Sequence, residues 1–360
     1  MNSTTPDILV VGAGIAGLTT ALALRHEGAS VTVVDQSQPG TEASWAGGGI
    51  LCPLYAWRYP DAVLALAARG MRDYPALIES LTGDTDPEHR VTGMRILDPV
   101  GAEESAAQIG ERLARYGIRH QWLDSPDAGR ASLVLPEVAN VRNPRLLQAL
   151  RETAEAHGIE IHANRRCEQV IARAGRFEHI ETSAGRMGAE RLVVAAGAWS
   201  EPLIPQARED SVFPVRGQML RLEPHGNSRL ETIVMDEGVY LIPRVDGSII
   251  VGSTVERAGF DKTVDMAVQQ ALHRKAIECW PDLAEASVTH RWAGLRPGSS
   301  DEVPILGEHP SLEGLWVNTG GYRNGLAMAP ATATFLTDLI TGRSPALDPA
   351  PYRVARILSA

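Results

Sequence analysis

The amino-acid sequence predicts an α/β part of the Rossmann type, interleaved with an α+β part that is built on an antiparallel sheet. Three observations predict this fold class. A strand, a glycine-rich turn, a helix and a second strand fill the first 35 residues, as at the start of a doubly wound fold. An uninterrupted apolar run at 192–196 and a largely apolar segment at 315–318 indicate further buried parallel strands. Between these runs, 213–222 and 231–255 are typical of antiparallel strands, so the two parts alternate along the chain.

The opening strand–helix–strand unit follows from hydrophobic periodicity. Residues 8–11 are all apolar, which predicts a strand with both faces buried. From 15 to 27 the apolar residues recur at helical spacing, and Gly28 supplies the stop signal. A second buried strand is expected at 31–34, and it ends at Asp35.

Later elements are marked by residues typical of their ends. Pro60 and Asp61 begin a helix that we expect to reach about Leu81. Asn143 is expected to cap the next helix, with Pro144 as its first helical residue. The other expected elements are a helix at 264–280 and strands at 91–97 and 167–171, with a hairpin turn at 245–248.

Composition limits the class of protein and its partners. The 360 residues suffice for roughly two domains of about 150 residues each. Hydrophobic residues make up 44% and charged residues 22%, which excludes a disordered chain. Lys and Arg number 34 against 44 Asp and Glu, so the net charge of −10 argues against a nucleic-acid partner.

The cysteines and the amino terminus carry further expectations. Three cysteines lie far apart without a C-x-x-C spacing, which predicts neither a disulfide framework nor a zinc site. The histidines show no H-E-x-x-H pattern, so we expect no metal. The first residues lack the basic and apolar regions of a signal peptide, and no apolar run is long enough for a membrane span. We therefore expect a soluble, cytoplasmic protein without a membrane partner.

Residues 12–17, Gly-Ala-Gly-Ile-Ala-Gly, match the dinucleotide fingerprint G-x-G-x-x-G between a strand and a helix. Gly12 makes the tight turn, Gly14 admits a pyrophosphate close to the backbone, and Gly17 lets the helix pack on the strand. The helix N-terminus then binds the pyrophosphate through its free N–H groups. Asp35 accepts hydrogen bonds from an adenosine ribose, and its charge disfavours the 2′-phosphate of NADP. This fingerprint fits NAD and FAD alike.

A second glycine-rich segment follows at 43–51, Ala-Ser-Trp-Ala-Gly-Gly-Gly-Ile-Leu. Three consecutive glycines lose much conformational entropy when they are ordered, so the motif indicates backbone lying against a flat ligand. A surface loop is the alternative interpretation. The apolar neighbours Trp45, Ile50 and Leu51 favour a buried segment.

With these two motifs the sequence resembles the flavoproteins of the D-amino-acid oxidase family, and within it the glycine oxidases linked to thiamine biosynthesis. The resemblance extends over nearly the whole chain in family order. The further motifs that carry it are VVAAGAW at 193–199, PVRGQ at 214–218, GVYLIPR at 238–244, VGST at 251–254, WAGLRP at 292–297 and GYRNGL at 321–326.

The resemblance implies an FAD-binding domain of the glutathione-reductase type and a separate substrate-binding domain. We expect the FAD-binding domain to comprise 1–88, 142–212 and 300–360, and the substrate-binding domain to comprise 89–141 and 213–299. Related sarcosine oxidases attach their flavin to a cysteine near the carboxyl end, where this chain has none. A covalent bond to Cys52 is the alternative to the expected non-covalent FAD.

The resemblance also implies which residues contact FAD. The backbone of Val170 is expected at the adenine, and the turn that begins at Gly321 is expected at the flavin ring. A helix starts after that turn, so its dipole would stabilise negative charge on the flavin. The expected contacts are Gly12, Gly14, Ile15, Ala16, Gly17, Asp35, Gln36, Ala43, Ser44, Gly48, Gly49, Ile50, Val170, Gly197, Gly321, Tyr322, Arg323, Asn324, Gly325, Leu326 and Ala327.

Arg323, Arg296 and Tyr240 are the expected substrate residues. A guanidinium group binds a carboxylate through two parallel charge-assisted hydrogen bonds. The resemblance places Arg323 at the substrate carboxylate and Arg296 and Tyr240 beside it. From the residues alone, Arg296 also fits a structural ion pair, and Tyr240 also fits a core aromatic with its hydroxyl at the rim.

The implied reaction is the oxidative deamination of glycine, with sarcosine and D-alanine as secondary substrates. A hydride passes from the substrate Cα to the flavin, the imine is hydrolysed to glyoxylate and ammonia or an amine, and O2 reoxidises the flavin to give H2O2. No general base stands out, as expected for hydride transfer from a neutral amine. Family members often form tetramers, which implies a homo-oligomer.

Several alternatives stay open at this point. One is a D-amino-acid dehydrogenase or oxidase of the same fold that acts on larger substrates or passes electrons to a quinone or a protein. Others are an NAD-linked dehydrogenase and a flavin-holding protein without turnover. Val255 and Gly321 replace a methionine and a histidine of some glycine oxidases, which leaves the size of the pocket open.

Overall fold

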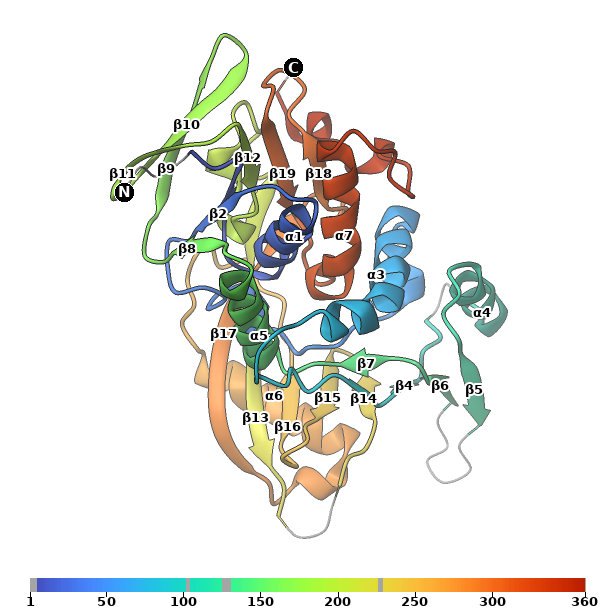
Figure 1. Ribbon diagram of the computed structural model, residues 1–360. Helices are drawn as coiled ribbons and strands as arrows, with labels where there is room; N and C mark the ends of the chain where they lie inside the picture. The colour runs from blue at the N-terminus through green and yellow to red at the C-terminus, as the bar shows by residue number, and fades with distance from the viewer. Residues whose placement is uncertain (1–4, 102–103, 125–130, 226–228, 360) are drawn as a thin grey trace.

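Two large sheets organise the protein in a computed structural model, which describes residues 5–101, 104–124, 131–225 and 229–359 (Figure 1). One sheet has six strands and the other has eight. The chain passes from the six-stranded to the eight-stranded sheet and back twice. The predicted fold class, with a Rossmann-type part interleaved with an antiparallel part, is confirmed.

The six-stranded sheet contains β1 (Ile8–Val11), β2 (Val31–Val34), β8 (Glu160–His162), β12 (Arg191–Val194), β18 (Ile305–Glu308) and β19 (Leu315–Thr319). Their order is β18-β19-β12-β1-β2-β8, and only the edge strand β18 runs antiparallel to its neighbour. The strands predicted from uninterrupted apolar runs all lie in this sheet.

Both faces of this sheet are covered, which explains why β1 is apolar at every position. Ile8 and Val10 of β1 pack toward the helices, whereas Leu9 and Val11 pack toward a separate three-stranded sheet. The helices of this layer are α1 (Ile15–His26), α3 (Asp61–Glu79), α5 (Asn143–Ala156) and α7 (Gly325–Ile340) (Figure 1). The three-stranded sheet contains β9 (Cys167–Arg173), β10 (Arg176–Thr182) and β11 (Gly185–Gly188).

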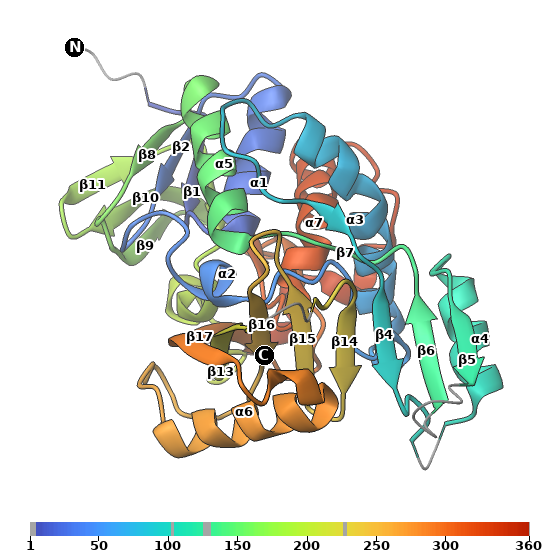
Figure 2. The same cartoon turned by 90° about the horizontal axis from the view of Figure 1, so that it is seen from below.

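The eight-stranded sheet contains β4 (Met94–Leu97), β5 (Gln121–Asp124), β6 (Ala131–Leu135), β13 (Val212–Glu223), β14 (Ile233–Asp236), β15 (Val239–Pro243), β16 (Ile249–Gly252) and β17 (Ser287–Ser299). Its order is β17-β13-β16-β15-β14-β4-β6-β5, antiparallel except between β14 and β4. Helix α6 (Met266–Cys279) packs on one face through Leu272, against Leu241 and Val251 (Figure 2). Tyr240 and Ile242 of β15 belong to the core on the opposite face.

The remaining elements are short. Strands β3 (Arg90–Val91) and β7 (Ala139–Asn140) pair with each other, α2 is Ala43–Ala46, and α4 is Ala106–Arg115. Single 3-10 turns lie at Ala56–Arg58, Gly197–Trp199, Glu201–Leu203, Pro281–Leu283, Ala350–Tyr352 and Val354–Ile357. Among these short elements, only Ala43–Ala46 and Gly197–Trp199 contain residues that were expected to contact FAD.

Two local predictions are wrong, each for a tertiary reason. Asn143 does not cap α5: Arg142 stands at the N-cap, and the buried Asn143 amide instead donates to the carbonyl of Ser44 at 2.6 Å. Trp45 is 41% exposed, although a buried segment was expected. The single turn of α2 buries only Ala46, and the ring of Trp45 meets that of Trp292 edge-on at the surface.

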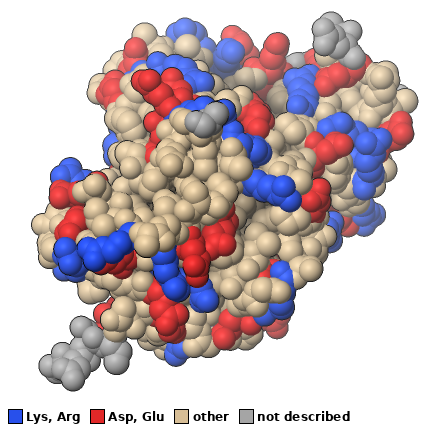
Figure 3. All heavy atoms as spheres, turned by 90° about the horizontal axis from the view of Figure 1, so that it is seen from above, with Lys and Arg blue, Asp and Glu red and all other residues tan. Residues whose placement is uncertain are grey.

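The described surface carries charges of both signs. Lys and Arg side chains are interspersed with Asp and Glu over the face seen in Figure 3. No helix of the described segments is long and apolar enough to span a bilayer. Within those segments no group of three or more His, Cys, Asp or Glu is arranged to hold a metal ion, and none of the three cysteines forms a disulfide bond.

Candidate active site

A cavity of about 520 Å³ lies where the carboxyl ends of β1, β2 and β12 meet the eight-stranded sheet. Gly12, Asp35 and Ala195, which follow these three strands, line one end of it. Tyr240 and Arg296, from β15 and β17, line the other end. Ligands of open α/β sheets bind at this edge because loops from several strands converge there.

The fingerprint glycines are required by close backbone contacts. Gly12 has φ of +111°, and a Cβ there would overlap the carbonyl of Ala195. A Cβ on Gly17 would overlap the carbonyl of Gly12, so α1 packs directly on the turn. Gly14 is the N-cap of α1 and has no side chain to cap the helix, and Ala16, in the first turn, lines the cavity. This backbone cradle has the shape and polarity that a pyrophosphate needs.

Asp35 is held at the end of β2 by three hydrogen bonds. The N–H of Ala13 donates to its Oδ2 at 2.7 Å, and the N–H and hydroxyl of Ser37 donate to its Oδ1 at 2.8 and 3.0 Å. The carboxylate keeps further lone pairs for a ribose. Gln36 also lines the cavity at this end.

Near β9, the cavity wall differs in detail from the residues expected to contact the adenine. Val170 packs against the core of the three-stranded sheet and does not line the cavity. Arg166, Cys167 and Glu168 line it instead, at the start of the same strand. The sequence did predict the strand at 167–171. Successive side chains of a strand point to opposite faces, so the sequence alone does not show which residue contacts a ligand.

The glycine-rich segment lies along the middle of the cavity. Ala43, Ser44, Gly48, Gly49 and Ile50 line it as expected. The hydroxyl of Ser44 accepts from the N–H of Ile15 at 3.0 Å and so ties this segment to the start of α1. Gly49 has φ of +82°, a conformation that favours glycine.

The segment is also tied to α5 through a residue that sequence reasoning missed. Asn143 lines the cavity, and its Oδ1 is a buried acceptor without a partner in the described protein. Its amide group is the donor to Ser44 described above. The only sequence signal was its place beside Pro144, which suggested a helix cap.

The carboxyl-terminal turn closes the middle of the cavity. Gly321, Tyr322, Arg323, Gly325 and Leu326 line it, and Gly197 faces it from the end of β12. Asn324 and Ala327 are buried, and like Gly17 they do not line the cavity. Helix α7 begins at Gly325 without a side-chain cap, so its first N–H groups and the positive end of its dipole lie at the wall.

At the opposite end of the cavity Arg296 is a half-buried cation held by neutral groups. Its Nη1 donates to the carbonyl of Thr254 at 3.1 Å, and its Nη2 donates to the hydroxyl of Ser253 at 2.6 Å. Burial lowers the pKa of Arg296, and the charge of Arg323 lowers it further, whereas Tyr240 raises it. No carboxylate pairs with Arg296 among the described residues, so the structural ion pair considered from sequence is absent there.

Arg323 and Tyr240 lie near Arg296, and both affect its pKa. Arg323 is exposed and forms no ion pair or hydrogen bond within the described segments. The N–H of the preceding Tyr322 donates to the carbonyl of Pro297 at 3.0 Å, which brings this turn beside Arg296. Tyr240 is 7% exposed, and its ring packs so closely on Gly252 that a Cβ there would lie 2.5 Å from it. The three expected substrate residues therefore share one end of the cavity.

Two cysteines line the cavity as protonated thiols. Burial raises the pKa of Cys52 to about 12 and that of Cys167 to about 11. Val255, noted as a departure from some glycine oxidases, is 51% exposed and lies off the wall. Gly321 has no room for a side chain, because a Cβ would lie 2.7 Å from the Cα of Gly325.

The residues present fit FAD at both ends. A backbone cradle and a ribose-binding carboxylate lie at one end, and a glycine-lined middle section leads to an unpaired guanidinium at the other. The lining residues that sequence reasoning did not single out for cofactor or substrate include Glu42, Leu54, Arg166, Trp199, Pro202, Leu203, Ser253, Thr319, Met328 and Thr332.

Comparison with known proteins agrees with this geometry. The family profile described as FAD dependent oxidoreductase matches residues 7–339. The chain is 42% identical to a glycine oxidase of Pseudomonas aeruginosa over 97% of this chain and 98% of the relative. It is 32% identical to the bifunctional protein ThiO/ThiG of Trichormus variabilis, over 93% of this chain and 53% of the relative.

A solved structure shows the same architecture over the full length. The crystal structure of glycine oxidase from Geobacillus kaustophilus superimposes with a TM-score of 0.89 at 26% identity, over 99% of this chain and 100% of that one. The resemblance inferred from the sequence motifs is thereby confirmed. With a family profile that spans nearly all of its length and a cavity that fits the cofactor, this chain belongs to the DAO family of FAD dependent oxidoreductases.

Proposed function

We propose that this chain oxidises glycine to glyoxylate, ammonia and H2O2, with sarcosine and D-alanine as secondary substrates. One observation carries the proposal. Arg296 presents a half-buried guanidinium without a carboxylate partner among the described residues at the end of the cavity, beside Tyr240. An α-amino acid supplies the missing carboxylate. The similarity to glycine oxidases supports glycine as that amino acid.

Bound FAD supplies the hydride acceptor and passes the electrons to O2. The protein supplies binding and orientation. We assign the anchored carboxylate contact to Arg296, because Thr254 and Ser253 fix its guanidinium plane. Arg323 adds a second positive charge from the open side, and Tyr240 places a hydroxyl beside Arg296. Together they hold the substrate by one end, so that its Cα lies at a defined distance from the cofactor.

We assign FAD binding to the fingerprint turn, Asp35, the segment 43–50 and the turn 321–327. We assign the adenine contact to residues 166–168, because Val170 does not line the cavity. The first N–H groups of α7 favour negative charge at the cavity. We propose the domain division 1–88, 142–212 and 300–360 for FAD and 89–141 and 213–299 for substrate. The bounds of β13, Val212–Glu223, and of β17, Ser287–Ser299, support it.

We propose that FAD is bound without a covalent link. The high pKa of Cys52 and of Cys167 keeps few thiolates available for attack on the flavin near neutral pH. Denaturation should release all yellow colour, and the denatured chain should have the mass of the polypeptide alone, 38.7 kDa. A chain heavier by one FAD would contradict this assignment.

The decisive experiment is the visible spectrum of the FAD-loaded protein before and after anaerobic addition of glycine. Bleaching of the flavin absorption and its return on admission of air would support the proposal. A spectrum untouched by glycine but bleached by D-proline or a larger D-amino acid would favour the alternative, a D-amino-acid oxidase or dehydrogenase. Turnover with a dye but not with O2 would favour a dehydrogenase that reduces a quinone or a protein.

We further propose a homo-oligomer, a tetramer in the family, and a cytoplasmic role in thiamine biosynthesis. The relatives named ThiO/ThiG, in which a region like this chain fills about half the length, support the role. The three cysteines form no disulfide bond in the structure, which supports a reducing compartment. Light scattering gives the mass of the oligomer, and growth of a deletion strain with and without thiamine tests the role.

A further inference from the structure

The backbone of the triple-glycine segment is held by donors from distant parts of the chain. The N–H of Val141 donates to the carbonyl of Gly49 at 2.9 Å. The Nη2 of Arg244 donates to the carbonyl of Gly48 at 2.8 Å. Because glycine has no side chain to restrict it, these hydrogen bonds decide where Gly47–Gly49 lie.

Arg244 joins three segments with one guanidinium group. Besides Gly48, its Nη1 donates to the side-chain Oδ1 of Asn140 at 3.0 Å and to the carbonyl of Val141 at 2.9 Å. Gly48 lies before α3, Asn140 and Val141 precede α5, and Arg244 directly follows β15 of the eight-stranded sheet. A planar guanidinium with fixed donor directions suits such a junction.

The strand before Arg244 contacts the same glycine. Residues two apart on a strand share a face, and Tyr240, Ile242 and Arg244 are spaced in this way. A Cβ on Gly48 would lie 2.7 Å from Ile242 and 3.1 Å from the ring of Tyr240. The substrate tyrosine and the hydrogen bond to Gly48 therefore belong to one rigid strand.

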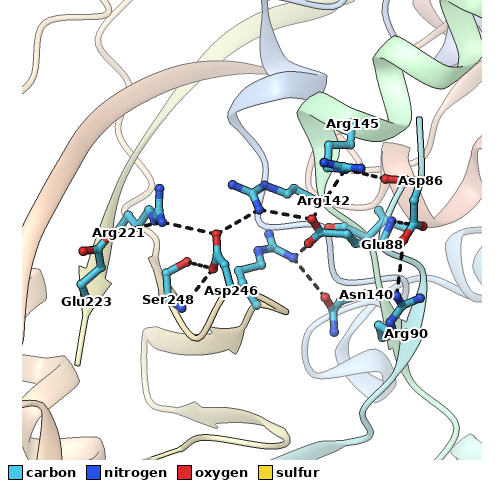
Figure 4. A network of polar contacts seen from close by, with 12 residues as sticks. Asp86, Glu88, Arg90, Asn140, Arg142, Arg145, Arg221, Glu223, Asp246 and Ser248 are labelled. Atoms are coloured by element: carbon cyan, nitrogen blue, oxygen red, sulfur yellow. Dashed lines mark hydrogen bonds and ion pairs between the residues drawn. The ribbon is translucent and has the colours of Figure 1, made fainter. Parts of the chain in front are cut away.

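The charge of Arg244 is balanced by a polar network around it. Burial is the main cause that lowers the pKa of Arg244 to about 10, and the charge of Arg142 adds to it, whereas Glu88 and Asp246 oppose it. Figure 4 shows Arg142 between Glu88 and Asp246, with which it forms ion pairs of 3.2 and 3.0 Å. Arg244 thus remains a cation at neutral pH, and its hydrogen bond to Gly48 is charge-assisted.

We propose that Arg244 is a positioning residue that sets the place of the glycine segment against the flavin and couples it to the substrate strand. The inference rests on the proposed function in one respect, namely that Gly48 and Gly49 contact the flavin. It assigns Arg244 no contact with the substrate. Its loss should weaken FAD binding, because the segment would have to be ordered by the cofactor itself.

The test compares Arg244→Gln and Arg244→Lys with Arg221→Gln. Arg221 belongs to the same network, where it pairs with Asp246 and Glu223, but it makes no hydrogen bond to the glycine segment. The readouts are the FAD dissociation constant of the apoprotein and the rise in Tm on adding FAD. For Arg244→Gln we expect the dissociation constant to increase about tenfold or more and the rise in Tm to shrink.

Arg244→Lys and Arg221→Gln separate a specific loss of FAD binding from a general loss of stability. Arg244→Lys keeps the positive charge but has one donor nitrogen in place of two. Its FAD dissociation constant should therefore lie between those of Arg244→Gln and the parent. If Arg244→Gln does not fold, Arg244→Lys serves as the test variant. Arg221→Gln should stay within about twofold of the parent. An apoprotein of lower Tm with unchanged FAD affinity would overturn the proposal. FAD affinity does not depend on which amine is oxidised, so this result is separate from the glycine test.

Discussion

The hydroxyl of Tyr74 in α3 donates a 2.7 Å hydrogen bond to the carbonyl of Leu326 in the first turn of α7. Within an α-helix that carbonyl would accept from the N–H four residues later, but Pro330 stands there and has none. Tyr74 supplies the missing donor from the neighbouring helix. The helices come this close because Gly70 faces the carbonyl of Ala327, which a Cβ would overlap.

Tyr74→Phe should therefore lower the free energy of unfolding by about 1–3 kcal/mol, because it leaves the Leu326 carbonyl unpaired. Urea denaturation of the FAD-loaded protein measures this. Tyr55→Phe is the matched control, since no hydrogen bond of its hydroxyl is seen within the described segments. Equal midpoints for the two variants would show that the bond to Leu326 contributes nothing.

Removal of either arginine at the substrate end should impair catalysis, with the larger effect at Arg296. Arg296→Ala should lower kcat/KM for glycine by about a hundredfold, because a charged hydrogen-bond donor in a desolvated site is lost. Arg323→Ala should raise KM and lower kcat by a smaller factor, because its exposed charge is screened. Steady-state H2O2 production measures both, and equal effects would contradict the anchored role of Arg296.

Gly217 offers a way to disturb Arg296 without changing any group that touches the substrate. A Cβ at Gly217 would overlap the guanidinium group of Arg296. Gly217→Ala should therefore displace that group and raise KM for glycine about tenfold, with FAD affinity unchanged. Gly188→Ala in β11 is the control, since a Cβ there meets its nearest atom at an ordinary 3.6 Å. An unaltered KM in Gly217→Ala would argue that Arg296 does not hold the carboxylate.

Glu256 should make folding sensitive to acid. Burial raises the pKa of Glu256, but hydrogen bonds from Thr254, Arg216 and Gln218 outweigh it and hold the pKa below its usual value. A folded-state pKa below the unfolded value stabilises the protein above about pH 4.3, and this stability is lost as the pH falls through the folded value. Urea midpoints at pH 7, 5 and 4 should fall less steeply for Glu256→Gln than for the parent. Parallel curves would contradict this.

Local sequence patterns were enough for the parallel strands and for the nucleotide-binding turn. The run at 8–11 is apolar at every position because both faces of β1 are buried, and the fingerprint glycines are required by contacts within 20 residues of chain or with the adjacent strand. The motif of the substrate strand, 238–244, also pointed to Tyr240. These signals can be read from the sequence because each is carried by residues that are consecutive in the chain.

Other features depended on partners far away in the chain. Trp45 was expected inside, yet only Ala46 of its short helix is buried. Asn143 was expected to cap a helix, yet it binds the carbonyl of Ser44, 99 residues earlier. Local propensity and periodicity describe neighbours in the sequence, so they do not predict contacts between distant residues. Those contacts form only when the two sheets pack together.

The sequence by itself determined the fold class and the FAD-binding family, and it predicted three polar residues that the structure brings to one end of the cavity. The tertiary structure gave Arg296 and Arg323 unequal positions: Arg296 is half-buried and donates to Ser253 and Thr254, whereas Arg323 is exposed. It also revealed that Arg244 reaches Gly48 across 196 residues. Motifs record which groups the chemistry needs, whereas burial and hydrogen-bond partners arise only when distant segments are packed together.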